Sequence, residues 1–122
     1  MRITLCGSAR FERQFHDWNE RLTIAGHTCY DLAVHPSFKE GNKDWYDEPT
    51  KMMLDLVHLD KIANSDAIVV LNVEDYIGFS TKREIIWARM QGKKVIWLEI
   101  PRTNSRHGDM NVMQIMQDHS IR

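Results

Sequence analysis

The sequence predicts an α/β fold built around a parallel β-sheet. Apolar segments of strand length alternate with segments in which apolar residues recur every three or four positions, which is typical of strand–helix–strand units. The segment DAIVVLNV at 66–73 is a near-continuous apolar run, as expected for a strand that is buried on both faces of a parallel sheet. A chain of 122 residues is long enough for one sizeable core, so we predict a single domain spanning residues 1–122.

The composition is that of an ordinary globular protein and argues against several functional classes. Hydrophobic residues make up 43%, charged residues 27%, and the formal net charge is −1, so no general affinity for nucleic acid or anionic membranes is expected. No apolar run approaches the roughly 18 residues of a membrane span and no signal-peptide pattern opens the chain, from which we predict a cytoplasmic protein. Cys6 and Cys29 are interpreted as buried free thiols, since no close His/Cys spacing indicates zinc; we expect neither metal nor cofactor.

Residues 2–6 are predicted to form the first strand and to lead through the turn GSAR into a helix. The apolar positions of this helix recur every three or four residues and form one stripe: Phe11, Phe15, Trp18, Leu22 and Ala25. Gly26 is expected to end the helix. HTCYD at 27–31 then forms a short second strand.

A polar loop at 33–48, which carries Phe38, Trp45 and Tyr46, precedes the second predicted helix. Pro49 fits the first turn of this helix, which runs to about Asn64. One face of the helix is apolar and is predicted to be buried: Met52, Leu56, Leu59 and Ala63. A second face carries Asp55, His58 and Ile62.

The strand at 66–73 is followed by a helix at 81–91, which Gly92 ends, and by a strand at 94–100. A polar tail leads to a last amphipathic helix after Asp109, with a stripe of Met110, Met113 and Met116. Helical crossovers between these strands predict a parallel sheet of four or five strands. Ligands bind such sheets at the carboxyl ends of the strands, where the strand order reverses. Functional residues are therefore expected in CGSAR, DLAVH and NVEDYIGFST.

The turn after the first strand is a candidate anion site. Gly7 permits close backbone approach, Ser8 is placed to cap the following helix, and free N–H groups in such a turn attract an anion. Arg10 offers a bidentate contact to phosphate. The alternative is an ordinary N-cap turn with a surface arginine. The turn matches neither G-x-G-x-x-G nor G-x-x-x-x-G-K-[ST], which argues against a dinucleotide site and a nucleoside-triphosphate hydrolase.

Two segments carry candidate catalytic groups. Asp55 and His58 lie three residues apart on one helix, and a carboxylate beside an imidazole suits proton transfer; the alternative is an exposed polar face. Thr81 and Glu84 have the spacing of a capping box. Alternatively, Glu84 is presented at the mouth of a cleft, where the helix dipole keeps its carboxylate ionised as the nucleophile of a glycosyl transfer.

The order of motifs resembles the nucleoside 2-deoxyribosyltransferase superfamily, which includes 2'-deoxynucleoside 5'-phosphate N-hydrolases, and within it a group of short bacterial and phage proteins. The similarity spans about residues 2–98, through ITLCGSAR, a helix ending in GH, HLDKIANSDAIVVLN and YIGFSTKREIIWA. The matching positions include His58, Lys61, Ile62, Ser65, Asp66, Asn72, Tyr76, Ile77, Gly78, Ser80, Thr81 and Glu84.

This resemblance implies a flavodoxin-like, Rossmann-like three-layer sandwich with a glutamate nucleophile at Glu84. The glycosyl–enzyme intermediate would be resolved by water or a second base. The resemblance also implies a homodimer or higher homo-oligomer, in which a neighbouring subunit completes the site. Three positions depart from the better-known enzymes, which have a tyrosine at Thr4, an aspartate at or beside His58 and a glycine at Ile86.

We therefore predict an N-glycosidase or deoxyribosyltransferase that acts on a nucleoside or nucleoside 5'-monophosphate. Glu84 attacks C1' while His58 or Asp55 assists departure of the base. The substrate is bound by Gly7, Ser8, Arg10, Asn72, Tyr76, Gly78, Ser80 and Thr81, and the aromatic loop covers the base. The alternatives are a nucleotide-binding protein without turnover and, third, hydrolysis of a larger N-glycoside such as a dinucleotide.

Overall fold

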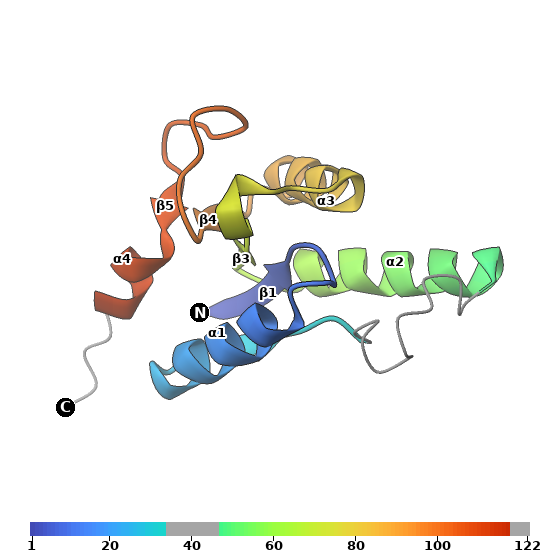
Figure 1. The fold of residues 1–122 in the computed structure, drawn as a ribbon, viewed down its shortest axis with the longest axis horizontal. Helices are drawn as coiled ribbons and strands as arrows, with labels where there is room; N and C mark the ends of the chain where they lie inside the picture. Colours follow the sequence, from blue (N-terminus) through green and yellow to red (C-terminus); the bar gives the residue numbers. More distant parts are fainter. Residues whose placement is uncertain (34–46, 118–122) are drawn as a thin grey trace.

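The computed structural model describes residues 1–33 and 47–117 (Figure 1). The predicted aromatic loop residues Phe38, Trp45 and Tyr46 lie outside the described residues. The first half of the chain forms β1 (Arg2–Cys6), α1 (Glu12–Ile24), β2 (Thr28–Tyr30) and α2 (Glu48–Ala63). The second half forms β3 (Ala67–Val70), a 3₁₀ turn (Val73–Asp75), α3 (Phe79–Met90), β4 (Lys94–Trp97), β5 (Met110–Asn111) and α4 (Val112–Gln117).

The five strands form one sheet in the order β2-β1-β3-β4-β5, and every neighbouring pair is parallel. The predicted α/β, flavodoxin-like arrangement with four or five strands is confirmed. Strand order reverses between β1 and β3, which pair from Ile3 with Ala67 to Cys6 with Val70. A ligand site is therefore expected next to Cys6 and Val70, at the carboxyl ends of these two strands.

Helices cover both faces of the sheet and give it two hydrophobic cores. On one face Ile3 and Leu5 pack with the predicted α1 stripe, where Phe15, Trp18 and Leu22 are buried, and with Val112 and Ile115 of α4. On the other face, Cys6 and the even-numbered β3 residues pack against α2 and α3 through Ile62, Ile85 and Ala88. β1 alternates its side chains between the two cores, as a strand must. Thr4 and Cys6 consequently point toward α2 and α3.

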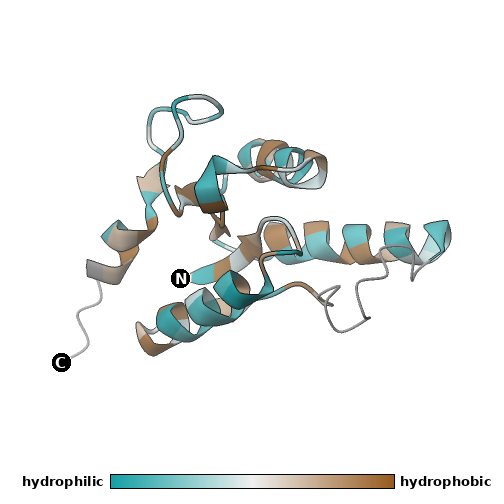
Figure 2. Cartoon of the chain, viewed as in Figure 1, coloured by the Kyte–Doolittle hydropathy of each residue, from teal (hydrophilic) through white to brown (hydrophobic). Residues whose placement is uncertain are grey.

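The predicted buried face of α2 is wrong in its first half, although Leu59 packs against the core. Met52 and Leu56 are 62% and 53% exposed, whereas His58 and Ile62 are buried against the sheet. Both faces of this helix carry apolar residues, so spacing alone did not identify the one that the strands cover. Figure 2 shows brown, hydrophobic stripes between teal ones along α2 and α3.

Of the two alternatives for Thr81 and Glu84, the capping box at the start of the third helix is wrong. α3 begins at Phe79, two residues before Thr81, and its N-cap is Gly78, which forms no side-chain capping bond. Thr81 is buried in the first turn. Glu84 therefore lies in the second turn of the helix, where the free N–H groups of the first turn no longer stabilise its charge as predicted.

The predicted C-terminal methionine stripe is only partly buried. Met110 belongs to the short strand β5, which the sequence did not predict, and Met116 packs against the core. Met113 is 44% exposed. The buried positions of α4 are instead Val112 and Ile115. Within the described residues, no helix has both the length and the apolar character to cross a membrane.

Candidate functional site

A cleft of ≈ 370 Å³ opens at the carboxyl end of β1, at the expected reversal of strand order. Its floor is the turn after β1, and its walls come from the end of β2, one side of α2 and the first turns of α3. This volume is within the usual range for small-molecule sites. Most of the predicted site residues line it: Gly7, Ser8, Asp55, His58, Gly78, Ser80, Thr81 and Glu84.

Gly7 sets the path of the chain into the cleft. Its φ of +151° lies in the region that favours glycine, and a Cβ at this position would lie 3.1 Å from the carbonyl oxygen of Leu71. The turn thus keeps its backbone close to β3. The prediction that Ser8 caps α1 is wrong, because the N-cap is Phe11 and forms no side-chain capping bond. The Ser8 hydroxyl instead accepts a long, 3.4 Å hydrogen bond from the backbone N–H of Arg10.

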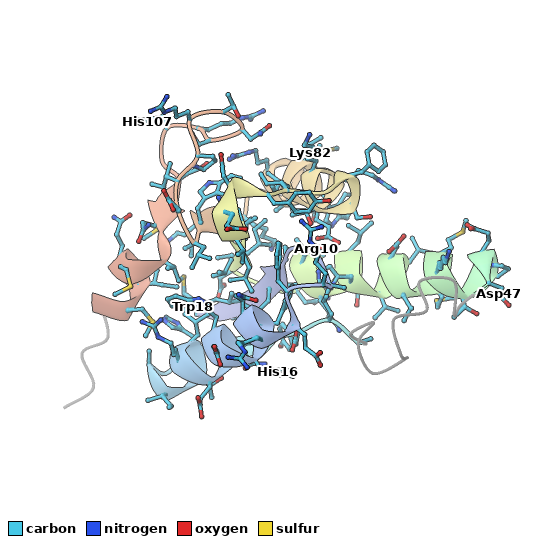
Figure 3. The ribbon with its side chains drawn as sticks, in the orientation of Figure 1. Arg10, His16, Trp18, Asp47, Lys82 and His107 are labelled. Atoms are coloured by element: carbon cyan, nitrogen blue, oxygen red, sulfur yellow. The ribbon has the colours of Figure 1, made fainter. Side chains whose placement is uncertain are left out.

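Arg10 lies beside the cleft and does not line it. Its guanidinium stacks 4.0 Å from the ring centroid of Tyr76 and 5.0 Å from that of Phe11. Figure 3 labels Arg10 near the middle of the molecule, on the loop that follows β1. The stack connects this loop to the segment before α3. Arg10 and Tyr76 therefore contact each other at the edge of the site. The predicted phosphate contact requires the Arg10 side chain to leave the Tyr76 ring and rotate toward the cleft.

Asn72 has a structural position rather than one on the cleft wall. Its side-chain N–H donates to the carbonyl of Glu99 at 2.7 Å, and its side-chain oxygen accepts from the Glu99 N–H at 3.2 Å. These two bonds join the chain after β3 to the chain after β4. Since Asn72 is 2% exposed, it acts on a ligand only through the backbone that it holds.

Glu84 projects from α3 into the cleft with a side chain only 14% exposed. The pKa of Glu84 is raised to about 7, chiefly because of burial; a hydrogen bond with Cys6 and the Arg83 charge lower it, and the nearby Asp55 carboxylate raises it. The predicted effect of the helix dipole, which is to keep this carboxylate ionised, is therefore outweighed. The physical reason is loss of water contact in the second turn of a packed helix.

His58 projects from α2 and faces Glu84. Its Nε2 atom lies 3.8 Å from Oε1 of Glu84. Burial and the Lys61 charge lower the pKa of His58 to about 4, against weaker raising effects of Asp31 and the Leu5 backbone. The imidazole is thus neutral at neutral pH, and its contact with Glu84 is not an ion pair there. No hydrogen bond or ion pair joins His58 to Asp55 within the described residues.

Cys6, the last residue of β1, is the third member of this cluster. Its Sγ lies 3.7 Å from the same Nε2 atom of His58. Cys6 is fully buried, and burial, followed by the charge of Glu84 and a hydrogen bond with it, raises the pKa of the thiol well above its ordinary value. Cys6 lies behind His58 and Glu84, away from the cleft surface. Three different elements therefore bring a thiol, an imidazole and a carboxyl group together.

Sequence reasoning did not assign Cys6 or Lys61 to the site. Lys61 lines the cleft one turn after His58 and donates a 2.8 Å hydrogen bond to the carbonyl of Asp31. Two available signals point to these residues. Cys6 directly precedes the turn at the carboxyl end of β1, and Lys61 lies three residues after His58, on the same face of α2.

Comparison with known proteins supports the fold. No protein-family model matches the chain, and no curated protein matches it. The chain is similar to the solved structure of a 2-deoxyribosyltransferase from Bacillus psychrosaccharolyticus, with a TM-score of 0.62 and 16% identity over 84% of this chain and 77% of that one. It is also similar to a CMP N-glycosidase from Clostridium botulinum, with a TM-score of 0.53 and 19% identity over 80% of this chain and 70% of that one. The predicted flavodoxin-like α/β fold is shared with both structures.

Proposed function

We propose that the protein cleaves or transfers the N-glycosidic bond of a nucleoside or nucleoside 5'-monophosphate, with Glu84 as the nucleophile. One observation carries this proposal: a buried glutamate lines a cleft at the reversal of strand order, and its only neighbour at ion-pair distance among the described residues is the neutral His58. A carboxyl group with a strongly raised pKa in a cleft is a candidate for chemistry rather than for stability. The solved structures of similar fold include a 2-deoxyribosyltransferase and a CMP N-glycosidase.

In the proposed reaction, the ionised form of Glu84 attacks C1' of the sugar. A bond forms between a carboxylate oxygen and C1', the bond from C1' to the base nitrogen breaks, and its electron pair leaves with the base. Water or a second base then attacks C1' and releases the carboxylate. With a pKa of about 7, a substantial part of Glu84 is ionised at neutral pH without needing a cationic partner.

Asp55 and His58 have different proposed roles. Asp55 is exposed and lines the cleft, so it is the group placed to assist departure of the base. His58 is neutral and 3.8 Å from the Glu84 carboxylate, so it positions the nucleophile by hydrogen bonding when the substrate draws the two together. The turn of Gly7 and Ser8 faces the same cleft and offers backbone N–H groups to a 5' oxygen or phosphate.

A nucleotide-binding protein without turnover is the second candidate. The observation in its favour is Thr4, which stands where the better-known enzymes have a tyrosine. Its hydroxyl is buried and lies 2.6 Å from the hydroxyl of Ser65, outside the cleft lining. No side chain of β1 other than Cys6 therefore reaches Glu84 to orient or activate it.

The decisive experiment incubates the metal-free protein with a panel of nucleosides and nucleoside monophosphates and measures released free base by chromatography. Release that depends on enzyme concentration supports the proposed reaction. Adding a second free base to the same reaction separates transfer, which yields a new nucleoside, from hydrolysis, which yields the sugar. Tight binding of one nucleotide with no release from any member of the panel would instead favour the second candidate.

A further inference from the structure

We propose that Cys6, His58 and Glu84 form a Zn²⁺ site whose fourth coordination position opens into the cleft. The three side chains come from β1, α2 and α3, and their ligand atoms all lie within 4.8 Å of one another. Thiolate sulfur, imidazole nitrogen and carboxylate oxygen are the three donor types that proteins use for zinc. This inference concerns metal binding and goes beyond the proposed glycosidic reaction.

Cys6 and Glu84 approach the same ring nitrogen of His58 and also contact each other, which distinguishes the cluster from a catalytic relay. Both Sγ of Cys6 and Oε1 of Glu84 approach Nε2 of His58, at 3.7 Å and 3.8 Å. In a nucleophile–histidine–carboxylate relay, the nucleophile contacts one ring nitrogen and the carboxylate contacts the other. Here the second ring nitrogen, Nδ1, is buried and has no hydrogen-bond partner within the described part of the chain. The three groups therefore surround a common point.

The distances fit a metal at this common point. Zinc bonds of about 2.3 Å to sulfur and about 2.0–2.2 Å to nitrogen and oxygen place tetrahedral ligands roughly 3.3–3.6 Å apart. The observed separations of 3.7 Å and 3.8 Å exceed this range by a few tenths of an ångström. The 3.8 Å separation is too long for a hydrogen bond, and a thiol forms only weak hydrogen bonds with its His58 and Glu84 neighbours. Small rotations of the side chains would complete the coordination.

The surroundings match a site that has three protein ligands and one open position. Cys6 is fully buried at the back, His58 is 6% exposed, and Glu84 faces the cleft, which provides an entry path. A thiolate and a carboxylate together carry the charge that neutralises Zn²⁺. The hard cations Mg²⁺ and Ca²⁺ prefer oxygen ligands throughout, so a sulfur and a nitrogen donor select against them.

Metal binding and glycosidic chemistry would compete for the same carboxylate. When Zn²⁺ holds Glu84, that group is not free to attack C1', so occupancy should stop base release and a chelator should restore it. This consequence rests on the proposed function, whereas the metal site itself does not. The two are tested separately.

The test of the site uses full-length protein stripped with a chelator and then titrated with Zn²⁺ against a chromophoric competitor. We expect about one zinc per chain. Loss of a residue that only supports a metal ligand typically weakens metal binding roughly 10- to 100-fold. Cys6→Ser removes a ligand itself and should weaken Zn²⁺ binding by more than this. The matched control is Cys29→Ser, which removes the other thiol, on β2 and outside the cluster, and should bind zinc as the parent does. Equal binding by the two serine variants, or no binding by the parent, would overturn the proposal.

A second measurement does not depend on any variant being folded. Co²⁺ replaces Zn²⁺ in such sites and gives a thiolate-to-metal charge-transfer band when sulfur is a ligand. We expect this band in the parent and in Cys29→Ser, with d–d bands of tetrahedral intensity. Co²⁺ bound to the parent without the thiolate band would show that Cys6 is not a ligand and would reject the site as proposed. Absence of base release from metal-free protein would count against the proposed reaction alone, whatever the metal result.

Discussion

The Nε2 atom of His58 lies 3.8 Å from Oε1 of Glu84, although the two side chains come from different helices and are 26 positions apart in sequence. Burial drives both groups toward their neutral forms, lowering the pKa of the imidazole and raising that of the carboxylic acid. A pair with these properties contributes little to stability as an ion pair. Its position in the cleft instead makes it the centre of the proposed chemistry.

Glu84→Gln should remove activity without loss of stability. The substitution eliminates the nucleophile, so base release from the metal-free protein should fall on the order of a thousandfold or more. Because α3 has no capping box and the carboxyl group is partly desolvated, the uncharged amide should leave the free energy of unfolding within about 1 kcal/mol of the parent value. Glu99→Gln, at an exposed glutamate outside the cleft, is the matched control. A folded Glu84→Gln protein with near-parental turnover would contradict the assignment.

Arg10→Ala should reduce the preference for monophosphates over nucleosides. If Arg10 leaves Tyr76 to contact a 5'-phosphate, its loss removes a charge-assisted hydrogen bond of roughly 1.5–3 kcal/mol, which corresponds to about ten- to a hundredfold in affinity. Competition binding with a matched nucleoside and monophosphate measures the effect. Arg13→Ala, on the exposed side of α1, is the control for a general loss of positive charge. Equal weakening of both ligands by Arg10→Ala would show that the site is not built for phosphate.

Met90→Glu and Leu56→Glu should disrupt a homodimer. Both side chains are exposed, and Met90 borders a groove of ≈ 230 Å³ between α2 and α3 that Ile86, Asp55 and Glu84 also line. Exposed apolar side chains beside a groove are expected to mark a protein–protein contact, and a second copy seated here would lie beside the candidate nucleophile. Sedimentation at micromolar concentration should show a dimer or larger species for the parent.

The matched control for this experiment is Ile24→Glu. Ile24 is 75% exposed at the end of α1, on the opposite face of the sheet, so its substitution should leave the assembly unchanged. A parent protein that sediments only as a 14.4 kDa species would contradict the predicted assembly.

Asp109→Asn should destabilise the fold in a pH-dependent manner. Burial alone would raise the pKa of Asp109, but hydrogen bonds from Arg89, Trp97 and the Arg106 backbone outweigh it and hold the pKa below its usual value. The substitution leaves the partly buried Arg89 without its carboxylate. At neutral pH the free energy of unfolding should therefore fall by an amount toward the lower end of about 3–5 kcal/mol.

The pH dependence follows from the lowered pKa. The stability that ionised Asp109 contributes is present above its unfolded-state pKa and is lost as pH falls through its folded-state pKa. The difference in free energy of unfolding between parent and Asp109→Asn should therefore shrink on acidification below about pH 4. Denaturant unfolding at a series of pH values measures it, with Asp17→Asn on the exposed side of α1 as control. A difference that stays constant through this range would argue against ionised Asp109 as its source.

Elements with one continuous apolar signal were predicted well from the sequence. The α1 stripe recurs every three or four residues, so its periodicity identifies both the helix and its buried face, and the continuous apolar run at 66–73 identifies a strand buried on both faces. The same periodicity did not identify the buried face of α2, because Met52 and Leu56 form an apolar face that the sheet does not cover. The start of α3 was misplaced because Gly78 provides only an extended backbone at the N-cap, without a side-chain signal. β5 is two residues long and too short for any periodicity.

Only the site residues at or shortly after the carboxyl ends of strands could be predicted from the sequence. Gly7, Ser8 and Glu84 were found because the carboxyl ends of parallel strands and the segments after them share one edge of the sheet. Cys6 itself lies at a strand end, but its clustering with His58 and Glu84 could not be found in this way. Spacing rules for metal ligands describe residues on one element, whereas this thiol, imidazole and carboxyl group meet only after three elements have packed together.

The hydrogen bonds between Asn72 and Glu99 have a consequence for ligand selection. They continue the pairing of β3 with β4 beyond its backbone ladder, so these two strand ends cannot separate without breaking both bonds. The segment that leads from β3 to the Gly78 and Ser80 wall of the cleft is thereby anchored at its start. Any adjustment to the size of a bound molecule must come from the opposite wall, where Leu32 and Ala33 follow β2 and Leu54 projects from α2. Discrimination between a one-ring and a two-ring base is therefore expected to depend on that wall.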